Sequence, residues 1–150
     1  MSELWKGELM SVALIGFLVP DERARAYEIA CCRNYFADLA RVFGVELKLI
    51  DPYGVGEAYP ETVSDLDTAL ASFPNHAIVH FAQSGIVHLA DLVHPAGDVV
   101  YVAGPDEGAE VGEIPGATTV TVATDILWAH HVLSMGMWDR AVKLGTWLSL

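Results

Sequence analysis

Apolar residues in the first third of the chain follow strand-like and helix-like spacing in turn. An apolar stretch at residues 10–19, closed by a Pro-Asp turn signal, predicts a buried strand. From residue 21 to residue 43 the apolar positions recur at helical spacing, and Gly44 stands where a C-terminal cap would lie. Residues 45–50 then alternate apolar and polar side chains, which predicts a second strand.

The same alternation continues to the C-terminus and is interrupted once by a long loop. This loop combines four glycines and two prolines with four acidic residues, a composition typical of irregular backbone. The predicted order is β-α-β-α-β-α-β-loop-β-α. Its remaining elements are helices at residues 61–73, 86–93 and 125–144, strands at 77–82, 98–103 and 118–123, and the loop at 104–116.

This order predicts one α/β domain over residues 1–150. Strands that alternate with helices form a largely parallel sheet with helices on both faces, and such sheets bind ligands at the C-terminal ends of their strands. The longest uninterrupted apolar run, residues 12–19, is far shorter than a membrane helix, and the N-terminus lacks the features of a secretory signal. We therefore expect a cytoplasmic protein that does not associate with a membrane.

Charge and apolar content bear on the partners of the chain. The 20 acidic and 8 basic side chains give a net charge of −12, which disfavours RNA and favours a basic protein partner. A hydrophobic content of 53% exceeds that of an average soluble domain, which indicates that part of the surface meets a partner chain. Adjacent Cys31 and Cys32 would form a strained disulfide, so we interpret them as reduced structural thiols.

The glycine-rich loop is the strongest local indication of a ligand site. A residue such as Gly104 lets the backbone approach a ligand closely, although the same composition is also typical of a solvated turn. The loop lacks the lysine of a phosphate-binding loop and the three spaced glycines of a dinucleotide fingerprint. Its acidic residues suit a neutral or cationic ligand better than a phosphate.

Several motifs resemble those of the SpoU/TrmH-type methyltransferases of the SPOUT, or α/β-knot, superfamily. Residues 118–124 are similar to the family's "hvvxIP" strand and loop, and residues 125–140 are similar to its closing helix, "LNxxxAxxxxxYDR". Residues 40–45 resemble the end of its first helix, "RxAxxFGv". The clearest match is to "L-x-HP … aiYvxGPEdG", carried here by Leu92, His94, Pro95 and Val99-Val100-Tyr101-Val102-Ala103-Gly104-Pro105-Asp106-Glu107-Gly108.

The resemblance implies a trefoil-knotted domain in which the closing helix threads through a loop. It further implies a bent S-adenosylmethionine as cofactor, a homodimer, and methylation of RNA at a ribose 2′-hydroxyl, whose sulfonium donor suits an acidic loop. The implied cofactor-binding residues form one wall of Gly104, Pro105 and Asp106, continued by Glu107 and Gly108, a second of Val122, Ala123 and Thr124, and a third of Leu127 with Ala129.

Four family positions carry different residues in this chain, among them the asparagine that precedes the first-helix arginine, which falls on Cys32, and the glutamate of "GPE", which is Asp106. The first-helix arginine that helps to deprotonate or orient the hydroxyl falls on Asp38, and the asparagine of the closing helix falls on Trp128. We therefore take Asp38 as a candidate general base. Arg33 and Arg41, on the same predicted helix, are candidates for stabilising the developing alkoxide in place of the family's arginine.

Histidines and tryptophans are assigned structural roles. No cysteine or carboxylate completes a metal cluster, and the neighbours His130 and His131 are expected to diverge on a helix, so we expect no metal. The tryptophans are interpreted as core or dimer contacts rather than a base-stacking platform. The residues weighed are His80, His88, His94, His130 and His131, with Trp128, Trp138 and Trp147.

Three functions stay open at this point. The first is an S-adenosylmethionine-binding RNA methyltransferase. The second is a catalytically silent protein of the same fold that regulates or inhibits through a protein partner, which the acidic balance fits at least as well. The third is a nucleoside-processing enzyme of ordinary α/β topology. Arg23, Arg33 and Arg41 gathered beside Gly104 would favour RNA, whereas their dispersal would favour a protein partner.

Overall fold

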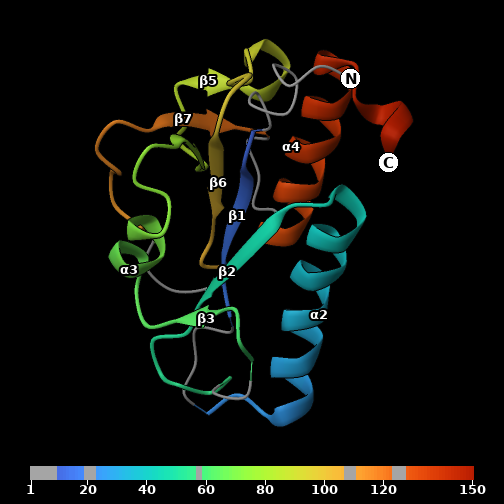
Figure 1. The fold of residues 1–150 in the computed structure, drawn as a ribbon. Coiled ribbons are helices and arrows are strands. Elements are labelled where there is room, and N and C mark those ends of the chain that lie inside the picture. Colours follow the sequence, from blue (N-terminus) through green and yellow to red (C-terminus); the bar gives the residue numbers. More distant parts are fainter. Residues whose placement is uncertain (1–9, 19–22, 57–58, 107–110, 123–127) are drawn as a thin grey trace.

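A parallel sheet of seven strands forms the centre of the molecule in the computed structural model, which describes residues 10–18, 23–56, 59–106, 111–122 and 128–150. The strand order is β3-β2-β1-β6-β4-β7-β5 (Figure 1). Every neighbouring pair is parallel. The strands are β1 (Val12–Phe17), β2 (Glu46–Ile50), β3 (Thr62–Val63), β4 (Ala77–Phe81), β5 (Val87–His88), β6 (Val99–Ala103) and β7 (Thr118–Thr121).

The two apolar strands β1 and β6 pair at the centre of the sheet. All residues of β6 are buried, as expected of a parallel strand that is covered on both faces. Successive side chains point to opposite faces, so Leu14 and its register partner Tyr101 enter the core beneath one helical layer. Ala13 and Val100 enter the core on the other face. One sheet thus separates two apolar cores.

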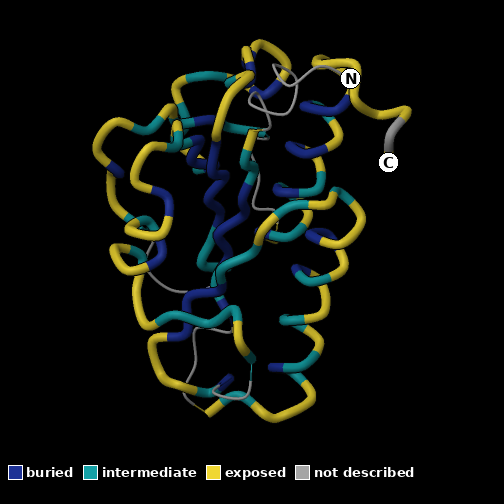
Figure 2. Tube along the Cα trace, in the orientation of Figure 1, coloured by how far each residue is buried: buried dark blue, intermediate teal, exposed yellow. Residues whose placement is uncertain are grey.

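Helices cover both faces of the sheet. Helices α2 (Ala26–Phe43) and α4 (Ala129–Leu144) lie side by side on one face, and α3 (Leu66–Ala71) lies on the other (Figure 1). Buried residues follow the central strands and the sheet-facing sides of α2 and α4 (Figure 2). Phe36 of α2 and Leu133 of α4 are completely buried there. The predicted α/β fold with a parallel sheet between helices is confirmed.

The helix ends follow local sequence signals. Gly44 ends α2 in the left-handed conformation at φ 64°, so the predicted glycine cap is confirmed. Gly145 ends α4 in the same way at φ 72°. Asp65 begins α3 by accepting a hydrogen bond from the Thr68 backbone N–H at 2.7 Å. Helix α2 begins at Ala26 and not near residue 21, and α3 is shorter than the predicted span of residues 61–73.

The predicted helix at residues 86–93 is wrong. That segment contains the short strand β5 and one turn of 3-10 helix, η1 (Leu89–Asp91). The segment lies at the sheet edge, and the backbone at Gly85 packs closely on β7. A Cβ at Gly85 would lie only 2.3 Å from the carbonyl carbon of Val120, so this close approach requires glycine. The strands β3 and β5 have two residues each, which is too short for hydrophobic spacing to predict.

The sequence also led to expectations about membrane helices, the two cysteines and the knot. Within the described ranges no helix is long and apolar enough to cross a membrane. Cys31 and Cys32 are thiols and are not joined in a disulfide; Cys31 is exposed, and the Cys32 thiol donates to the carbonyl oxygen of Phe17 at 3.7 Å. The expected knot would involve the loop after β6 and the approach to α4. Parts of both, residues 107–110 and 123–127, lie outside the described residues.

Candidate functional site

The sheet has a topological switch point between β1 and β6. From β1 the chain proceeds to β2 and β3 on one side, whereas from β6 it proceeds past β4 to β7 on the other. In open parallel sheets, ligands bind beyond the C-terminal ends of the strands at such a point. These ends are Phe17 in β1 and Ala103 in β6. The glycine-rich loop leaves the sheet at this place.

Gly104, the first residue after β6, lies against both neighbouring elements. Its φ is 107°, a backbone conformation that side chains other than glycine rarely adopt. A Cβ at this position would lie 2.9 Å from Cδ2 of Phe17 and 3.5 Å from the Cβ of Ala129. Close packing of β6 on β1 and α4 therefore requires glycine here, independently of any ligand.

Asp106 connects the loop to the start of α4. Its Oδ1 accepts a short hydrogen bond from the backbone N–H of Ala129, the first residue of the helix. A carboxylate is favoured there because the first N–H groups of a helix lack internal partners and carry positive partial charge. The bond closes the loop onto α4, so Gly104 and Asp106 both lie against Ala129; that these residues bind a cofactor stays a prediction.

The remaining predicted cofactor contacts are only partly described. Val122, after β7, is half-buried and packs against the same core as Ala129. Five others lie outside the described residues: Glu107, Gly108, Ala123, Thr124 and Leu127.

An imidazole lies beside this junction. His130, the second residue of α4, stacks on Tyr35 of α2 with ring centroids 4.5 Å apart and planes at 22°. Its edge faces Phe36 at 6.2 Å. Burial and the neighbouring His131 lower the pKa of His130, and the Asp106 carboxylate opposes this effect. Sequence reasoning missed this cluster, although His130 directly follows Ala129, a predicted cofactor contact.

Arg33 does not extend freely into the site. Its guanidinium pairs with the Glu61 carboxylate and lies over the Tyr59 ring, 4.8 Å from the centroid. The hydrogen bond to Glu61 raises the pKa of Arg33. Burial is the largest single effect on Glu61 and raises its pKa, but the bond from Arg33, a backbone hydrogen bond and the charge of Arg33 together hold that pKa below its usual value. The pair joins α2 to the segment before β3.

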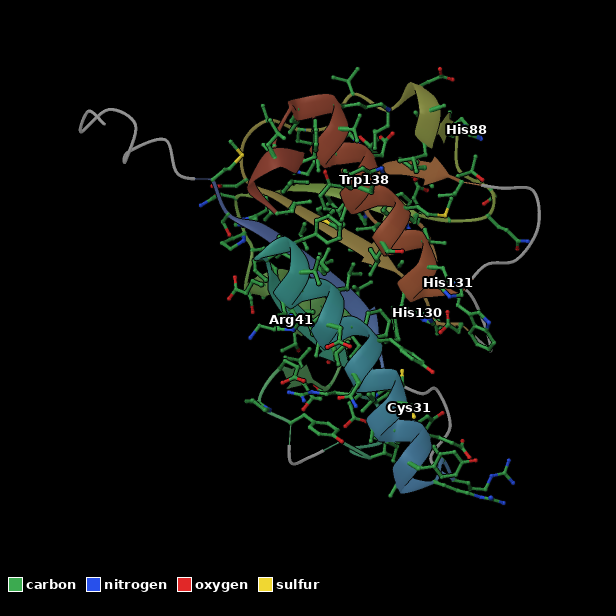
Figure 3. All side chains as sticks on the ribbon, turned by 90° about the vertical axis from the view of Figure 1, so that its right-hand side faces the viewer. Cys31, Arg41, His88, His130, His131 and Trp138 are labelled. Atoms are coloured by element: carbon green, nitrogen blue, oxygen red, sulfur yellow. The ribbon has the colours of Figure 1, made fainter. Side chains whose placement is uncertain are left out.

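Asp38 and Arg41 occupy exposed positions further along α2. They form an ion pair of 3.5 Å, and their side chains are 71% and 72% exposed. Arg41 lies towards the C-terminal end of α2, whereas His130 and His131 lie at the start of α4 (Figure 3). Arg23 precedes α2. Asp38 and Arg41 are therefore paired with each other and Arg33 is paired with Glu61, so the three candidate catalytic residues do not form one cluster.

Several residues that carry the family resemblance meet elsewhere, in a buried polar network between β6 and the C-terminal half of α4. Nδ1 of His94 lies 2.8 Å from the Tyr101 hydroxyl, and its Nε2 lies 2.6 Å from Asp139. Arg140 donates to the Tyr101 hydroxyl at 3.1 Å and to the carbonyl of Pro95 at 2.6 Å. The motif residues thus fasten α4 to the sheet rather than line the switch point.

Lys143 extends this network to η1. Its ammonium pairs with Asp139 at 2.9 Å and donates to the carbonyls of Leu89, Ala90 and Leu92 at 2.8, 3.0 and 3.0 Å. The bonds form one directed chain when Tyr101 donates to Nδ1 of a neutral His94 whose Nε2–H donates to Asp139.

Acid should destabilise the fold through this network. Burial lowers the pKa of His94 and outweighs its bond to Asp139, so the unfolded chain takes up the proton first. We expect the free energy of unfolding to fall as pH drops below about 6.5, with His130 contributing in the same direction. Urea unfolding at pH 7.5 and 5.5 measures this. His94→Gln should weaken the dependence; an unchanged difference between the two pH values would contradict the assignment.

The remaining histidines were considered as metal ligands from the sequence. Within the described part of the chain, no group of three or more histidine, cysteine or acidic side chains is placed to hold a metal ion. The expectation that His130 and His131 diverge is wrong, because their ring centroids are 4.3 Å apart. His88 accepts a hydrogen bond from the Ala90 N–H at 3.1 Å on the β5 edge.

Comparison of this chain with known proteins identifies a protein that shares its fold. No family model matches the sequence, and no curated protein matches it. Among solved structures, a candidate RNA methyltransferase from Bacillus anthracis superposes with a TM-score of 0.60. The match covers 91% of this chain and 96% of that chain at 10% sequence identity. At this identity the likeness establishes a shared α/β fold and nothing about the reaction.

Proposed function

We propose that this protein binds S-adenosylmethionine and methylates RNA at a ribose 2′-hydroxyl. The observation that carries the proposal is the Asp106–Ala129 hydrogen bond, which holds the glycine-rich loop against the start of α4 at the switch point. The motifs that resemble those of the SpoU/TrmH-type methyltransferases support it, and the proposal includes the trefoil knot of that family. The shared fold with a candidate RNA methyltransferase also supports the proposal.

The described residues fit a cationic methyl donor. Asp106 lies at the switch point, and Arg33 of α2 is paired with Glu61. A sulfonium would be attracted by the carboxylate, whereas a phosphate would be repelled. Gly104, Pro105 and Val122 would contact the cofactor, which supplies an electrophilic methyl group when bound. Half-buried Val122 adds apolar surface of the kind that lines small-molecule pockets.

A homodimer forms part of the proposal. Met135, Trp138 and Val142 lie on α4 and are 44%, 52% and 50% exposed, which is unusual for large apolar side chains on one helix face. Trp138 lies in the middle of this helix (Figure 3). Pairing two copies through α4 would remove this surface from water.

Calorimetric titration of the purified chain tests cofactor binding without knowledge of the substrate. We expect S-adenosylmethionine and S-adenosylhomocysteine to bind with micromolar affinity, about 8 kcal/mol. S-adenosylhomocysteine lacks the sulfonium charge, so Asp106→Asn should weaken S-adenosylmethionine more than S-adenosylhomocysteine while keeping an oxygen acceptor for the Ala129 N–H. Absence of binding by both ligands would overturn the proposal.

A second candidate is a catalytically silent protein of this fold that acts through a basic protein partner. The pairing of Arg33 with Glu61 and of Arg41 with Asp38 favours it, because RNA phosphates need clustered cations. The net charge of −12 would attract a basic partner. Methyl transfer from S-adenosylmethionine to RNA separates the two candidates: it is required by the first and absent in the second.

A further inference from the structure

Methyl transfer to a hydroxyl requires a proton acceptor, and the candidates inferred from sequence are poorly placed for this step. Asp38 is 71% exposed and paired with Arg41. The guanidinium of Arg33 is held by Glu61 and Tyr59. A general base must instead come within hydrogen-bond reach of a substrate at the switch point. This argument rests on the proposed function.

We propose that His130 is the general base of this reaction, held by the Tyr35 ring and assisted by the Asp106 carboxylate. His130 follows Ala129 in α4. The N–H of Ala129 is bonded to Asp106, and its methyl group lies 3.5 Å from where a Cβ at Gly104 would be. The imidazole is therefore adjacent to the loop that forms the predicted cofactor wall.

The surroundings of His130 suit a base that is neutral before the reaction. Partial burial and His131 lower its pKa, and the positive end of the α4 dipole also disfavours an imidazolium at the second helical residue. The parallel contact with Tyr35 fixes the ring plane. Asp106 acts in the opposite sense, because its negative charge stabilises the imidazolium that forms when the proton arrives.

The other described histidines are placed less well. His94 has both ring nitrogens engaged by Tyr101 and Asp139, and His80 is buried within the sheet. His88 accepts a backbone hydrogen bond at the β5 edge. His76 packs against Phe73, in the core on the face opposite α4. His131 neighbours the site but is exposed.

The methyl transfer accounts for every bond, electron pair and proton with the groups named above. As the hydroxyl oxygen bonds to the methyl carbon, the carbon–sulfur bond breaks and its electron pair goes to sulfur. The hydroxyl proton passes to a ring nitrogen of His130, and water later removes it. Asp106 does not take the proton; it holds the loop and stabilises the charged ring.

The test combines transfer of radiolabelled methyl from S-adenosylmethionine to unfractionated transfer and ribosomal RNA with NMR titration of the His130 imidazole. For the wild type we expect the rate to rise with pH along the titration of His130 and then to level off. His130→Gln should lower kcat by about 10²- to 10⁴-fold. Its affinity for S-adenosylhomocysteine should match the wild type, which separates a base from a residue that only binds cofactor.

Two variants should move the titration in opposite directions. Asp106→Asn removes the attractive charge and should lower the pKa of His130, whereas His131→Gln removes a repulsive neighbour and should raise it. The acidic limb of the rate profile should follow the NMR titration in both. His88→Gln, on the far sheet edge, is the matched control and should leave rate and profile unchanged.

The outcomes are distinguishable. Transfer that persists in His130→Gln with an unchanged pH profile overturns the role of His130 and leaves the proposed function intact. A loss of S-adenosylhomocysteine affinity equal to the loss of rate makes His130 a binding residue and also overturns the proposal. A wild type that binds cofactor but transfers no methyl group to RNA overturns the proposed function, and the base with it.

Discussion

Gly104→Val is expected to lower the free energy of unfolding by about 3 to 5 kcal/mol. The backbone at Gly104 has φ 107°, which strains a β-branched residue, and the new Cβ would lie 2.9 Å from Cδ2 of Phe17. Because Phe17 ends β1 and Ala129 begins α4, the clash separates three elements at once. Urea unfolding should give a lower midpoint with little change in slope.

Gly112→Val is the matched control, since it adds the same side chain to the same loop. Gly112 is exposed, its φ is not in the left-handed region, and no heavy atom of the described residues lies within 4 Å of its ideal Cβ position. We expect a change within about 0.5 kcal/mol. Equal stability of the two variants would contradict the packing role of Gly104. Cofactor binding by Gly104→Val should be compared with that of the wild type under conditions where both proteins are folded to the same extent.

Local sequence signals predicted most of the layered fold. The apolar runs of β1 and β6 and the helical spacing of α2 and α4 reflect burial, which periodicity reports directly. The short strands β3 and β5 form through pairing with β2 and β7, and contacts between distant segments leave no periodic trace. The amphipathic pattern at residues 86–93 reflected an edge segment packed on the sheet rather than a helix.

Only part of the candidate site could be predicted from the sequence, because contacts between distant segments leave no local signal. The nearness of Gly104, Asp106 and Ala129 was implied by motif resemblance, and the Asp106–Ala129 hydrogen bond realises it. The contact of Tyr35 with His130 joins two helices, and its signal was limited to the position of His130 directly after Ala129. Spacing alone also gave no means to separate the motif residues that line the site from those that hold the fold.

Arg140→Met tests whether the motif residues hold the fold, and it is expected to lower the free energy of unfolding by about 2 to 3 kcal/mol. Arg140 is only 7% exposed, and its guanidinium is bonded to the Tyr101 hydroxyl and the Pro95 carbonyl. Methionine has similar length and helix propensity, so the loss reports the unpaired acceptors rather than α4 itself. Tyr101→Phe should be partly non-additive with it, because both variants break the same bond.

Arg41→Met provides the matched control for this prediction. Arg41 also belongs to a covering helix and forms an ion pair, but its side chain is 72% exposed and its partner Asp38 is 71% exposed. Exposed pairs of this kind contribute about 0 to 1 kcal/mol. Urea unfolding should therefore distinguish the two arginines clearly. If Arg140→Met were as mild as Arg41→Met, the network would not fasten α4, and its motif residues would need a role outside the fold.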